Sequence, residues 1–374
     1  MRRIVPLLAP PLFSLFALAP LALLTACSSD DTAAGSTSGG AVKTDGQYEE
    51  EAVTGMHDLL LADIKTMGEG AAEIQKAAPA PPDRGWDAAL DAAAIAGMKA
   101  AWVKAREAYE HSEGALAPLF PSVDNALDAR YDDFMTQLGA QGGDSDLFDG
   151  VGVTGMHALE RVIYADVTPA YVVTFEETLP GYVPAAFPKT AAEAASFKDK
   201  LCGKFIADTS KLESLWTPAN IDVVIAFQGL IALIKEQGEK VNKASSFEEE
   251  SRYSQRTMAD LRANLAGSKA VYAMFEPWIL SKKAPGDPTK DGPTIDANIK
   301  AGFAGLEAAY SAVSGAAIPA PPATWSSVNP SDADKKTPFG QLFLAVDAAV
   351  DPTAPGSIVA QMNDAADALG FPAL

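Results

Sequence analysis

Cysteine, histidine and basic residues are scarce in this sequence of 374 residues. It contains two cysteines and three histidines, and 49 acidic residues outnumber 29 Lys and Arg, for a formal net charge of −20. A chain this acidic repels phosphate backbones, so we expect no nucleic-acid partner. Two cysteines exclude a disulfide-stapled miniprotein. The length and the 48% hydrophobic content support a sizeable core instead, and the acidic charge alone indicates a solvated surface.

The chain begins with a segment typical of an export signal. Two arginines precede an uncharged apolar run from Ile4 to Thr25. Leu24-Thr25-Ala26-Cys27 resembles the lipobox of bacterial lipoproteins, in which cleavage leaves the cysteine as the lipid-bearing N-terminus. A retained membrane helix is the alternative, but prolines interrupt the run and no basic cluster follows it. We therefore expect a signal peptide over residues 1–26, lipidation of Cys27, and an exported protein anchored to the cell envelope.

The residues after the signal contain mainly Ser, Thr, Gly, Ala and Asp, with no aromatic residue up to position 46. Such a composition cannot bury a core, so residues 27–46 are expected to form a flexible lipid-anchored tether. The folded domain is expected over residues 47–374. After processing, Cys202 is the remaining cysteine that is not lipidated, and its place in a predicted helix indicates a buried thiol.

Apolar residues that recur at steps of three and four predict an all-α fold. These stripes predict helices over 53–74, 90–108 and 295–313, a central buried helix over 221–234, and two shorter helices over 339–350 and 358–369. The expected architecture is a helical bundle, or two four-helix-type bundles packed together.

Two further segments have patterns of their own. Ser246 with Glu249 three residues later forms a capping-box pattern, which predicts a helix from there to about Pro277. The best alternation typical of a strand lies over 171–175, within a proline-bounded segment at 169–188. We expect that segment to be a long loop or a small hairpin.

One pentapeptide occurs twice. Val53-Thr54-Gly55-Met56-His57 recurs as Val153-Thr154-Gly155-Met156-His157, and a helical pattern follows each copy. The second copy continues to Glu160 where the first has Leu60, and the flanking sequences differ. Coincidence and remote duplication both remain open, and we assign His57 no ligand role.

A histidine and a carboxylate in the second copy have spacing that suits a metal. His157 and Glu160 are three residues apart, so on a helix they point the same way and can hold one cation between imidazole and carboxylate. By itself this spacing favours a hydrogen-bonded surface pair over a metal site. Further ligands must come from other segments.

Two acidic segments precede this motif. The stretch from 101 to 113 places Trp102, Arg106, Tyr109 and Glu113 along one helical stripe, with Glu110 beside them. In the next segment, Asp124, Asp128 and Asp132 step by four. On their own these patterns are typical of solvated acidic helix faces, with Arg106 and Glu110 as an i,i+4 pair.

Taken in order, four patterns resemble the imelysin-like family. They are Trp-x-x-x-Arg-x-x-Tyr-x-x-x-Glu from Trp102, Asp128-Ala129-Arg130, Gly-x-His-x-x-Glu from Gly155, and Glu250-Ser251-Arg252-Tyr253-Ser254. The resemblance covers residues 47–285 and is greatest to the EfeO and EfeM branch of bacterial iron-uptake proteins. The chain looks like the shorter EfeM form, without a cupredoxin domain. His111 and Gly114 depart from the family pattern, and the segments 137–151 and 169–188 look longer than usual.

The resemblance implies a helical metal-binding protein that delivers iron to a permease, with a haem-peroxidase-type partner as in the Efe system. The ligands that it implies are His157, Glu160, Asp128 and one or both of Glu110 and Glu113. Residues implied around these ligands are Arg106, Tyr109, Arg130, Arg252 and Tyr253. One imidazole with several carboxylates suits iron, or zinc as the second choice, better than Cu(I).

Two other functions remain open. The family's founding name is that of a peptidase, but a catalytic zinc needs a third protein ligand and an open water position. The spare histidines, His57 and His111, lie in no recognisable third-ligand motif, so we expect no enzyme activity. A polysaccharide-binding or structural lipoprotein is the other alternative, although aromatic residues are only 8% and show no cluster for stacking on sugars.

Overall fold

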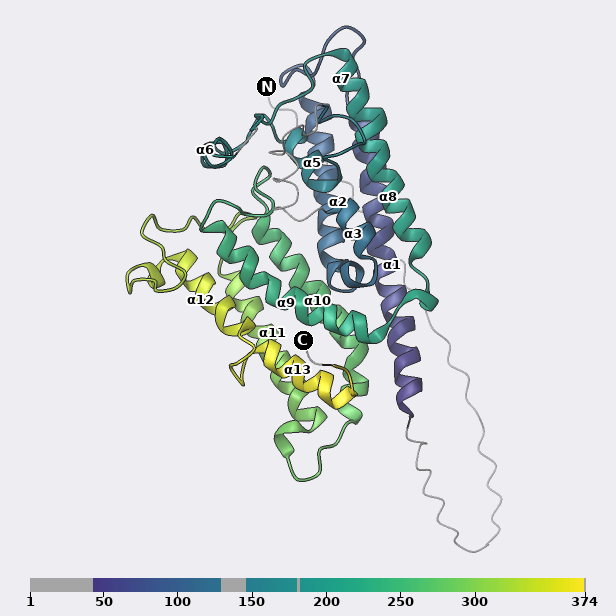
Figure 1. Ribbon diagram of the computed structural model, residues 1–374, viewed down its shortest axis with the longest axis vertical. Helices are drawn as coiled ribbons and strands as arrows, with labels where there is room; N and C mark the ends of the chain where they lie inside the picture. Colours follow the sequence, from purple (N-terminus) through teal and green to yellow (C-terminus); the bar gives the residue numbers. More distant parts are fainter. Residues whose placement is uncertain (1–42, 129–145, 180–181, 373–374) are drawn as a thin grey trace, which may run out of the picture. The chain divides into compact units, whose positions relative to one another are not determined.

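The computed structural model describes residues 43–128, 146–179 and 182–372 (Figure 1). Our predictions for residues 1–26, for Cys27, for most of the tether and for Arg130 fall outside these ranges. Within them, every regular element is a helix, which confirms the predicted all-α class. The described residues contain no helix with the length and apolar character that crossing a bilayer requires.

The helices fall into two groups along the chain. The first group is α1 (Asp45–Ala77), α2 (Ala92–Leu119), α3 (Pro121–Leu127), α5 (Gly155–Ile163), α6 (Ala170–Glu176), α7 (Ala191–Ser196) and α8 (Cys202–Leu215). The second group is α9 (Val223–Ala244), α10 (Thr257–Ser281), α11 (Gly292–Ser311), α12 (Pro338–Val350) and α13 (Ile358–Leu369). Short π and 3-10 turns lie at Phe197–Leu201, Pro218–Asn220, Pro288–Lys290 and Asp334–Lys336.

Helix α1 illustrates how the periodic pattern produces the fold. Met56, Leu60 and Ile64 recur on one face and are buried against the rest of the protein. Thr44 caps the helix, because its hydroxyl accepts from the Gln47 backbone N–H while the Gln47 side chain accepts from the Thr44 N–H. The helix therefore begins at Asp45, two residues inside the segment expected to be a tether.

The two groups share one hydrophobic core. Helix α1 packs along α2 and α8, while α2 also packs along α9 and α10 of the second group. The buried apolar side chains form a single continuous cluster that includes residues of both groups. Since α2 belongs to both packing arrangements, the two groups are parts of one body and share its core.

Glycines allow α2 to approach its neighbours closely. A β-carbon on Gly229 of α9 would clash with the carbonyl oxygen of Gly114, and one on Gly267 of α10 would clash with that of His111. Both contacts lie on the last turns of α2, next to Glu110 and Glu113. The backbones of three helices therefore come together at the place where the acidic residues are concentrated.

The capping-box prediction at Ser246 is wrong. Helix α9 runs to Ala244, and α10 begins only at Thr257. The Ser246 hydroxyl donates to the carbonyl of Lys243 and so belongs to the end of α9. Phe247, with φ at 66°, leaves the helical region immediately afterwards. The residues between α9 and α10, 245–256, form an irregular segment.

The loop or hairpin expected over residues 169–188 is corrected in its first part, whereas the described residues 177–179 and 182–188 contain no helix or strand, as expected of a loop. Residues 170–176 form the short helix α6, which begins after Pro169. Val172 and Glu176 are buried one turn apart, so the alternation over 171–175 coincides with a helical period. A window of five residues is too short to distinguish the two periods.

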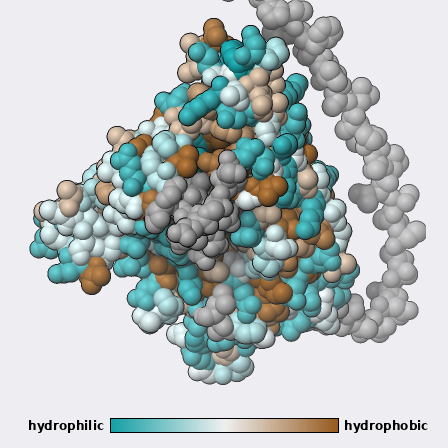
Figure 2. Space-filling model, turned by 45° about the horizontal axis from the view of Figure 1, so that its top comes forward, coloured by the Kyte–Doolittle hydropathy of each residue, from teal (hydrophilic) through white to brown (hydrophobic). Residues whose placement is uncertain are grey.

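Other predictions from periodicity are confirmed. The segments 339–350 and 358–369 correspond to α12 and α13, and the stripe over 295–313 lies on α11. Cys202 is a free, buried cysteine at the start of α8. On the face of the molecule in Figure 2, hydrophilic residues surround limited hydrophobic areas, as the acidic composition leads one to expect.

Candidate metal centre

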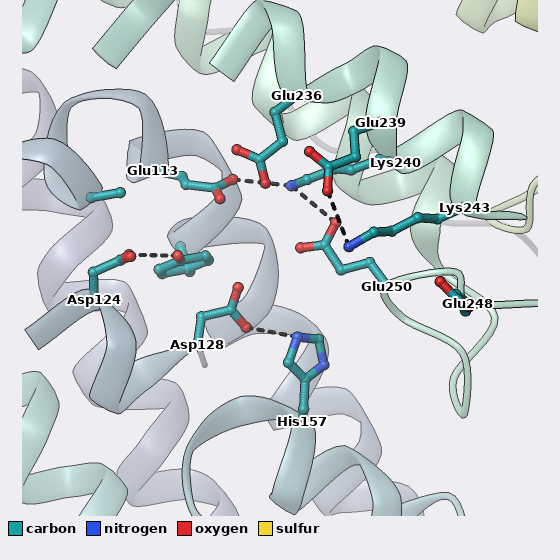
Figure 3. A pocket seen from close by; sticks show the side chains of 12 residues that line it. Glu113, Asp124, Asp128, His157, Glu236, Glu239, Lys240, Lys243, Glu248 and Glu250 are labelled. Carbon is teal, nitrogen blue, oxygen red and sulfur yellow. Dashed lines mark hydrogen bonds and ion pairs between the residues drawn. The ribbon is translucent and has the colours of Figure 1, made fainter. Parts of the chain in front are cut away.

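A cavity of about 220 Å³ lies where α2, α3, α5, α9 and the segment 245–256 meet (Figure 3). Its lining is strongly acidic. The charged or titratable side chains around it are Tyr109, Glu113, Asp124, Asp128, His157, Glu236, Glu239, Lys240, Lys243, Glu248 and Glu250.

The start of α5 brings His157 to Asp128. Gly155 has φ at +85°, and a β-carbon there would lie 2.7 Å from the Leu127 carbonyl oxygen. Glycine thus lets α5 begin in contact with the end of α3, where Asp128 follows Leu127. His157 Nε2 lies 3.1 Å from Asp128 Oδ1 (Figure 3).

Three ligand atoms converge at this point. Asp128, His157 and Glu250 each offer one atom, and the three atoms lie within 4.8 Å of one another. They come from the end of α3, from α5 and from the irregular segment before α10. Among the described residues, no other group of His, Cys, Asp and Glu side chains meets this condition.

Glu160 lies behind the imidazole of His157. One of its oxygens is 3.5 Å from His157 Nδ1, and the other accepts a hydrogen bond of 2.8 Å from the Ser254 backbone N–H. Both residues are buried. Glu160 therefore orients the imidazole and joins α5 to the segment that carries Glu250.

Arg106 lies at the centre of the carboxylates. It is fully buried and forms ion pairs with Glu110, Asp128 and Glu250, the last at 2.7 Å. The Oδ2 of Asp260 lies 3.8 Å from its Nε. This placement agrees with the expectation that Arg106 orients acids.

Lys240 of α9 holds the remaining predicted ligands. Its Nζ lies 3.2 Å from an oxygen of Glu110. The same Nζ lies 3.2 Å from Glu113 and 3.0 Å from Glu250 (Figure 3). The Asn264 amide donates to both Glu110 and Glu113, at 2.7 and 2.8 Å. The two glutamates thus bind a lysine and an amide, and neither belongs to the group of three convergent ligands.

The residues around His157 determine whether its imidazole is protonated. Burial lowers the pKa of His157, but the charge of Asp128 and hydrogen bonds to Asp128 and Glu160 outweigh it and raise the pKa to about 10. Burial raises the pKa of Asp128, and the charges of Arg106 and His157 reverse that effect and hold it well below its usual range. At neutral pH, therefore, the imidazolium and the Asp128 carboxylate form an ion pair.

The carboxyl groups of Glu110, Glu113 and Asp124 titrate near neutrality. Burial raises the pKa of Glu110 and of Glu113 to about 8, although Lys240 acts on both in the opposite direction. Burial also raises the pKa of Asp124 to about 7, against the hydrogen bond of 2.7 Å from the Tyr109 hydroxyl. Without a further cation, the cavity therefore retains protons near pH 7.

Several predicted residues lie away from the convergent ligands. Arg252 Nη1 is 3.6 Å from a Glu176 oxygen, and the Tyr253 hydroxyl donates to the same carboxylate, so both contact α6. His57 pairs with its neighbour Asp58, and His111 pairs with Asp63 on α1 at 2.8 Å. Neither of these histidines lines the cavity.

Sequence reasoning did not assign Glu250 or Lys240 to the site. Glu250 opens one of the four family-like patterns, but it lies in an irregular segment, which has no period from which to predict the direction of its side chain. Lys240 had a readable signal, because it falls on the buried stripe of α9 with Gln237 and Ala244. A charged residue in register with an apolar face is typical of a buried, paired side chain.

The arrangement has the chemistry of a cation site. Two carboxylate oxygens and one imidazole nitrogen form a donor set that hard and borderline metal ions prefer. To act as a ligand, His157 must lose its proton, and the metal must compete with Arg106 for Asp128 and Glu250. The residues fit a metal that carries at least two positive charges.

Fold and cavity together define a class, that of all-helical proteins with a buried, histidine-containing acidic pocket. The model of the imelysin family, peptidase M75, matches residues 69–343, and the chain belongs to this family. The crystal structure of an imelysin-like protein from Psychrobacter arcticum 273-4 is similar in fold, with a TM-score of 0.58 and 12% sequence identity. The match covers 89% of this chain and 99% of that one. No curated protein sequence matches the chain.

Proposed function

We propose that this protein binds a metal cation as cargo, with Asp128, His157 and Glu250 as its protein ligands. The observation that carries the proposal is the convergence of three ligand atoms from separate segments within 4.8 Å, at a cavity large enough to admit an ion with bound water. Membership of the imelysin family supports it, because the resemblance in sequence implied a metal site at the Gly-x-His-x-x-Glu motif.

Iron is the proposed ion, with zinc as the second choice. The donors are two carboxylates and one imidazole, without thiolate or thioether, and the cavity contains further carboxylates that can accept hydrogen bonds from bound water. The proposal extends to an EfeM-like role, in which a lipoprotein anchored at Cys27 hands iron to a permease and works with a haem-peroxidase-type partner.

The roles of the other predicted ligands are refined in this proposal. Glu160 orients His157, while Glu110 and Glu113 hold Lys240 near the cavity. Removing Glu160 should weaken the metal site through the imidazole. Removing Glu110 or Glu113 should act through Lys240 and Glu250.

Peptidase activity rests on the family's description alone. A catalytic zinc is usually held by three protein ligands and activates a water for attack. Around these three ligands, no described residue of the cavity lining identifies a peptide-binding groove. We therefore propose a binding protein and not an enzyme.

The test is metal analysis of protein purified without chelators and without a histidine tag, followed by competition between iron and zinc. We expect about one bound ion per chain in the parent, with iron retained against equimolar zinc. Glu250→Gln removes a proposed ligand charge with little change of shape and should lower the occupancy. Glu213→Gln, at an exposed position of α8 that does not line the cavity, is the matched control. A parent without bound metal after incubation with either ion would contradict the proposal.

A further inference from the structure

The segment 245–256 carries Glu250 to the cavity and contains two residues with unusual backbone. Phe247 has φ at 66° and Gln255 has φ at 58°. Left-handed backbone is unfavourable for residues that have a β-carbon, and bulky side chains adopt it least readily. Contacts from outside the segment must therefore hold these two residues in place.

Tyr171 of α6 contacts both of them. Its ring packs against the ring of Phe247 with centroids 5.6 Å apart, and its hydroxyl lies 2.7 Å from the side-chain oxygen of Gln255. The same hydroxyl donates to the carboxylate of Glu249, which Gln255 Nε2 also contacts at 2.9 Å. One side chain thus connects the two left-handed residues with the immediate neighbour of Glu250.

Glu249 and Glu250 are consecutive but bind different partners. Glu249 is buried and engaged by Tyr171 and Gln255. Glu250 reaches Arg106 at 2.7 Å and Lys240 at 3.0 Å. Because the two residues share one planar peptide group, a backbone rotation that frees Glu249 also turns Glu250.

Helix α6 is held chiefly by this same segment. Glu176, near its end, accepts from Tyr253 and lies 3.6 Å from Arg252. By contrast, α6 takes no part in the more extensive helix–helix packing of the described residues, and in Figure 1 it stands apart from the long helices. Tyr171 therefore contacts the segment at residues 247, 249 and 255, and Glu176 contacts it at residues 252 and 253, which lie between them.

We infer that Tyr171 is a positioning residue for the metal site, because it clasps Phe247, Glu249 and Gln255 and so fixes the direction in which Glu250 enters the cavity. The function of α6 is then to hold the third ligand in place from outside the bundle. The effect of Tyr171 on metal affinity rests on the proposed function. Its effect on the backbone of the segment 245–256, measured by hydrogen exchange, does not.

The first experiment is hydrogen exchange of the metal-free protein. Tyr171→Ala should speed exchange at the amides of Ser251, Ser254 and Arg256, which donate to Thr257 Oγ1, Glu160 and the Ser251 carbonyl, by about tenfold or more. Exchange in α1 and α2 should stay at the parent rate. Thr174→Ala is the matched control, since this exposed residue of α6 only donates to the Ala170 carbonyl. Parent-like exchange over 245–256 in Tyr171→Ala would overturn the inference, whether or not the chain binds metal.

The second experiment measures binding and dissociation of Fe²⁺ and Zn²⁺. Tyr171→Ala should bind about tenfold more weakly than the parent and release the ion faster, because the ligand must be ordered during binding. Tyr171→Phe keeps the ring contact without the hydroxyl and should lie between the two, and Thr174→Ala should match the parent. Equal affinity in parent and Tyr171→Ala would refute the positioning role. A parent that binds neither ion would refute the proposed function. The hydrogen-exchange result alone would then decide whether Tyr171 holds the segment 245–256 in place.

Discussion

The two copies of Val-Thr-Gly-Met-His have the same sequence and opposite environments. The first lies in the middle of α1, where His57 is near the surface and pairs with the exposed Asp58. The second begins α5, where His157 is buried between Asp128 and Glu160. The two copies differ in the position of the pentapeptide within its helix and in the element that packs against the pentapeptide.

Glycine shows the difference most clearly. Gly55 is an ordinary residue inside a long helix, next to the flexible side chain of Met274. Gly155 has left-handed φ and contacts the backbone of Leu127. The comparison teaches that five identical residues determine neither the start of a helix nor the burial of its histidine, because both depend on tertiary contacts.

The largest expected effect separates the two histidines. His157→Ala removes the nitrogen ligand and should weaken binding of iron and zinc by about a hundredfold or more. His57→Ala should leave the affinity unchanged, since its side chain pairs with Asp58 away from the cavity. Titration calorimetry on both variants makes the comparison. If the two variants bind alike, the difference in environment has no functional meaning.

The next effect separates the two glycines in folding stability. Gly155→Ala combines left-handed backbone with a β-carbon 2.7 Å from a carbonyl oxygen, and it should lower the free energy of unfolding by about 2 kcal/mol or more. Gly55→Ala gains about 1 kcal/mol in helix propensity, which offsets the displacement of Met274, so it should be nearly neutral. Chemical denaturation of the metal-free proteins measures both. A neutral Gly155→Ala would show that the start of α5 is not constrained.

The third effect concerns Glu160, which stands where the first copy has Leu60. Glu160→Gln keeps the shape but removes the charge that faces His157 Nδ1, and it should weaken metal binding by about tenfold. Glu213→Gln, at an exposed position of α8, serves as the control for loss of one acidic charge. Parent-like affinity in Glu160→Gln would mean that the carboxylate only anchors the Ser254 N–H.

The smallest effect is a response to pH. The pKa of His157 is about 10 in the folded protein, so its imidazole must lose one proton to bind a metal near neutrality. Affinity should therefore rise with pH, by about threefold for each half unit from pH 7 upwards for one proton per ion. Loss of protons from Glu110 and Glu113, with pKa values of about 8, acts in the same direction. Calorimetry in buffers of different ionisation enthalpy counts the protons, and an affinity that falls with pH would contradict the site.

The stability of the metal-free protein should change with pH in the opposite sense. The pKa of His157 is raised from 6.5 in the unfolded chain to about 10 in the folded protein. Its protonated imidazole therefore stabilises the fold fully below pH 6.5, and this contribution is lost as the pH rises toward 10. The raised pKa values of Glu110 and Glu113 likewise favour the fold at low pH, and that advantage is lost between 4.5 and about 8. Thermal unfolding should show a lower midpoint at pH 9 than at pH 6, whereas a higher midpoint at pH 9 would indicate a neutral His157.

Long helices could be predicted from the sequence because their stripes repeat many times. The segment 358–369 has the same bounds as α13, and the stripe of α1 is buried from Met56 to Ile74. Short or irregular segments could not be predicted. Residues 171–175 contain too few periods, and the Ser246 hydroxyl had a competing acceptor at the end of α9.

The candidate site was predictable where its residues lie on helices. His157 and Asp128 meet as the resemblance implied, whereas Glu250 depends on contacts made by an irregular segment. The pattern of α2 predicted a solvated acidic face for Glu110 and Glu113, because their partners Lys240 and Asn264 lie on other helices. Burial of these acids results from the close approach of α9 and α10 at Gly229 and Gly267.

Arg106 and Lys240 give the pocket permanent counter-ions. Acids crowded together without a cation repel one another, and a site built from them alone would open whenever it is emptied. Here both cations are buried among the carboxylates and contact Glu110 and Glu250 together. We therefore expect the empty pocket to keep its shape, and the proposed carrier to pass through repeated rounds of loading and release without refolding.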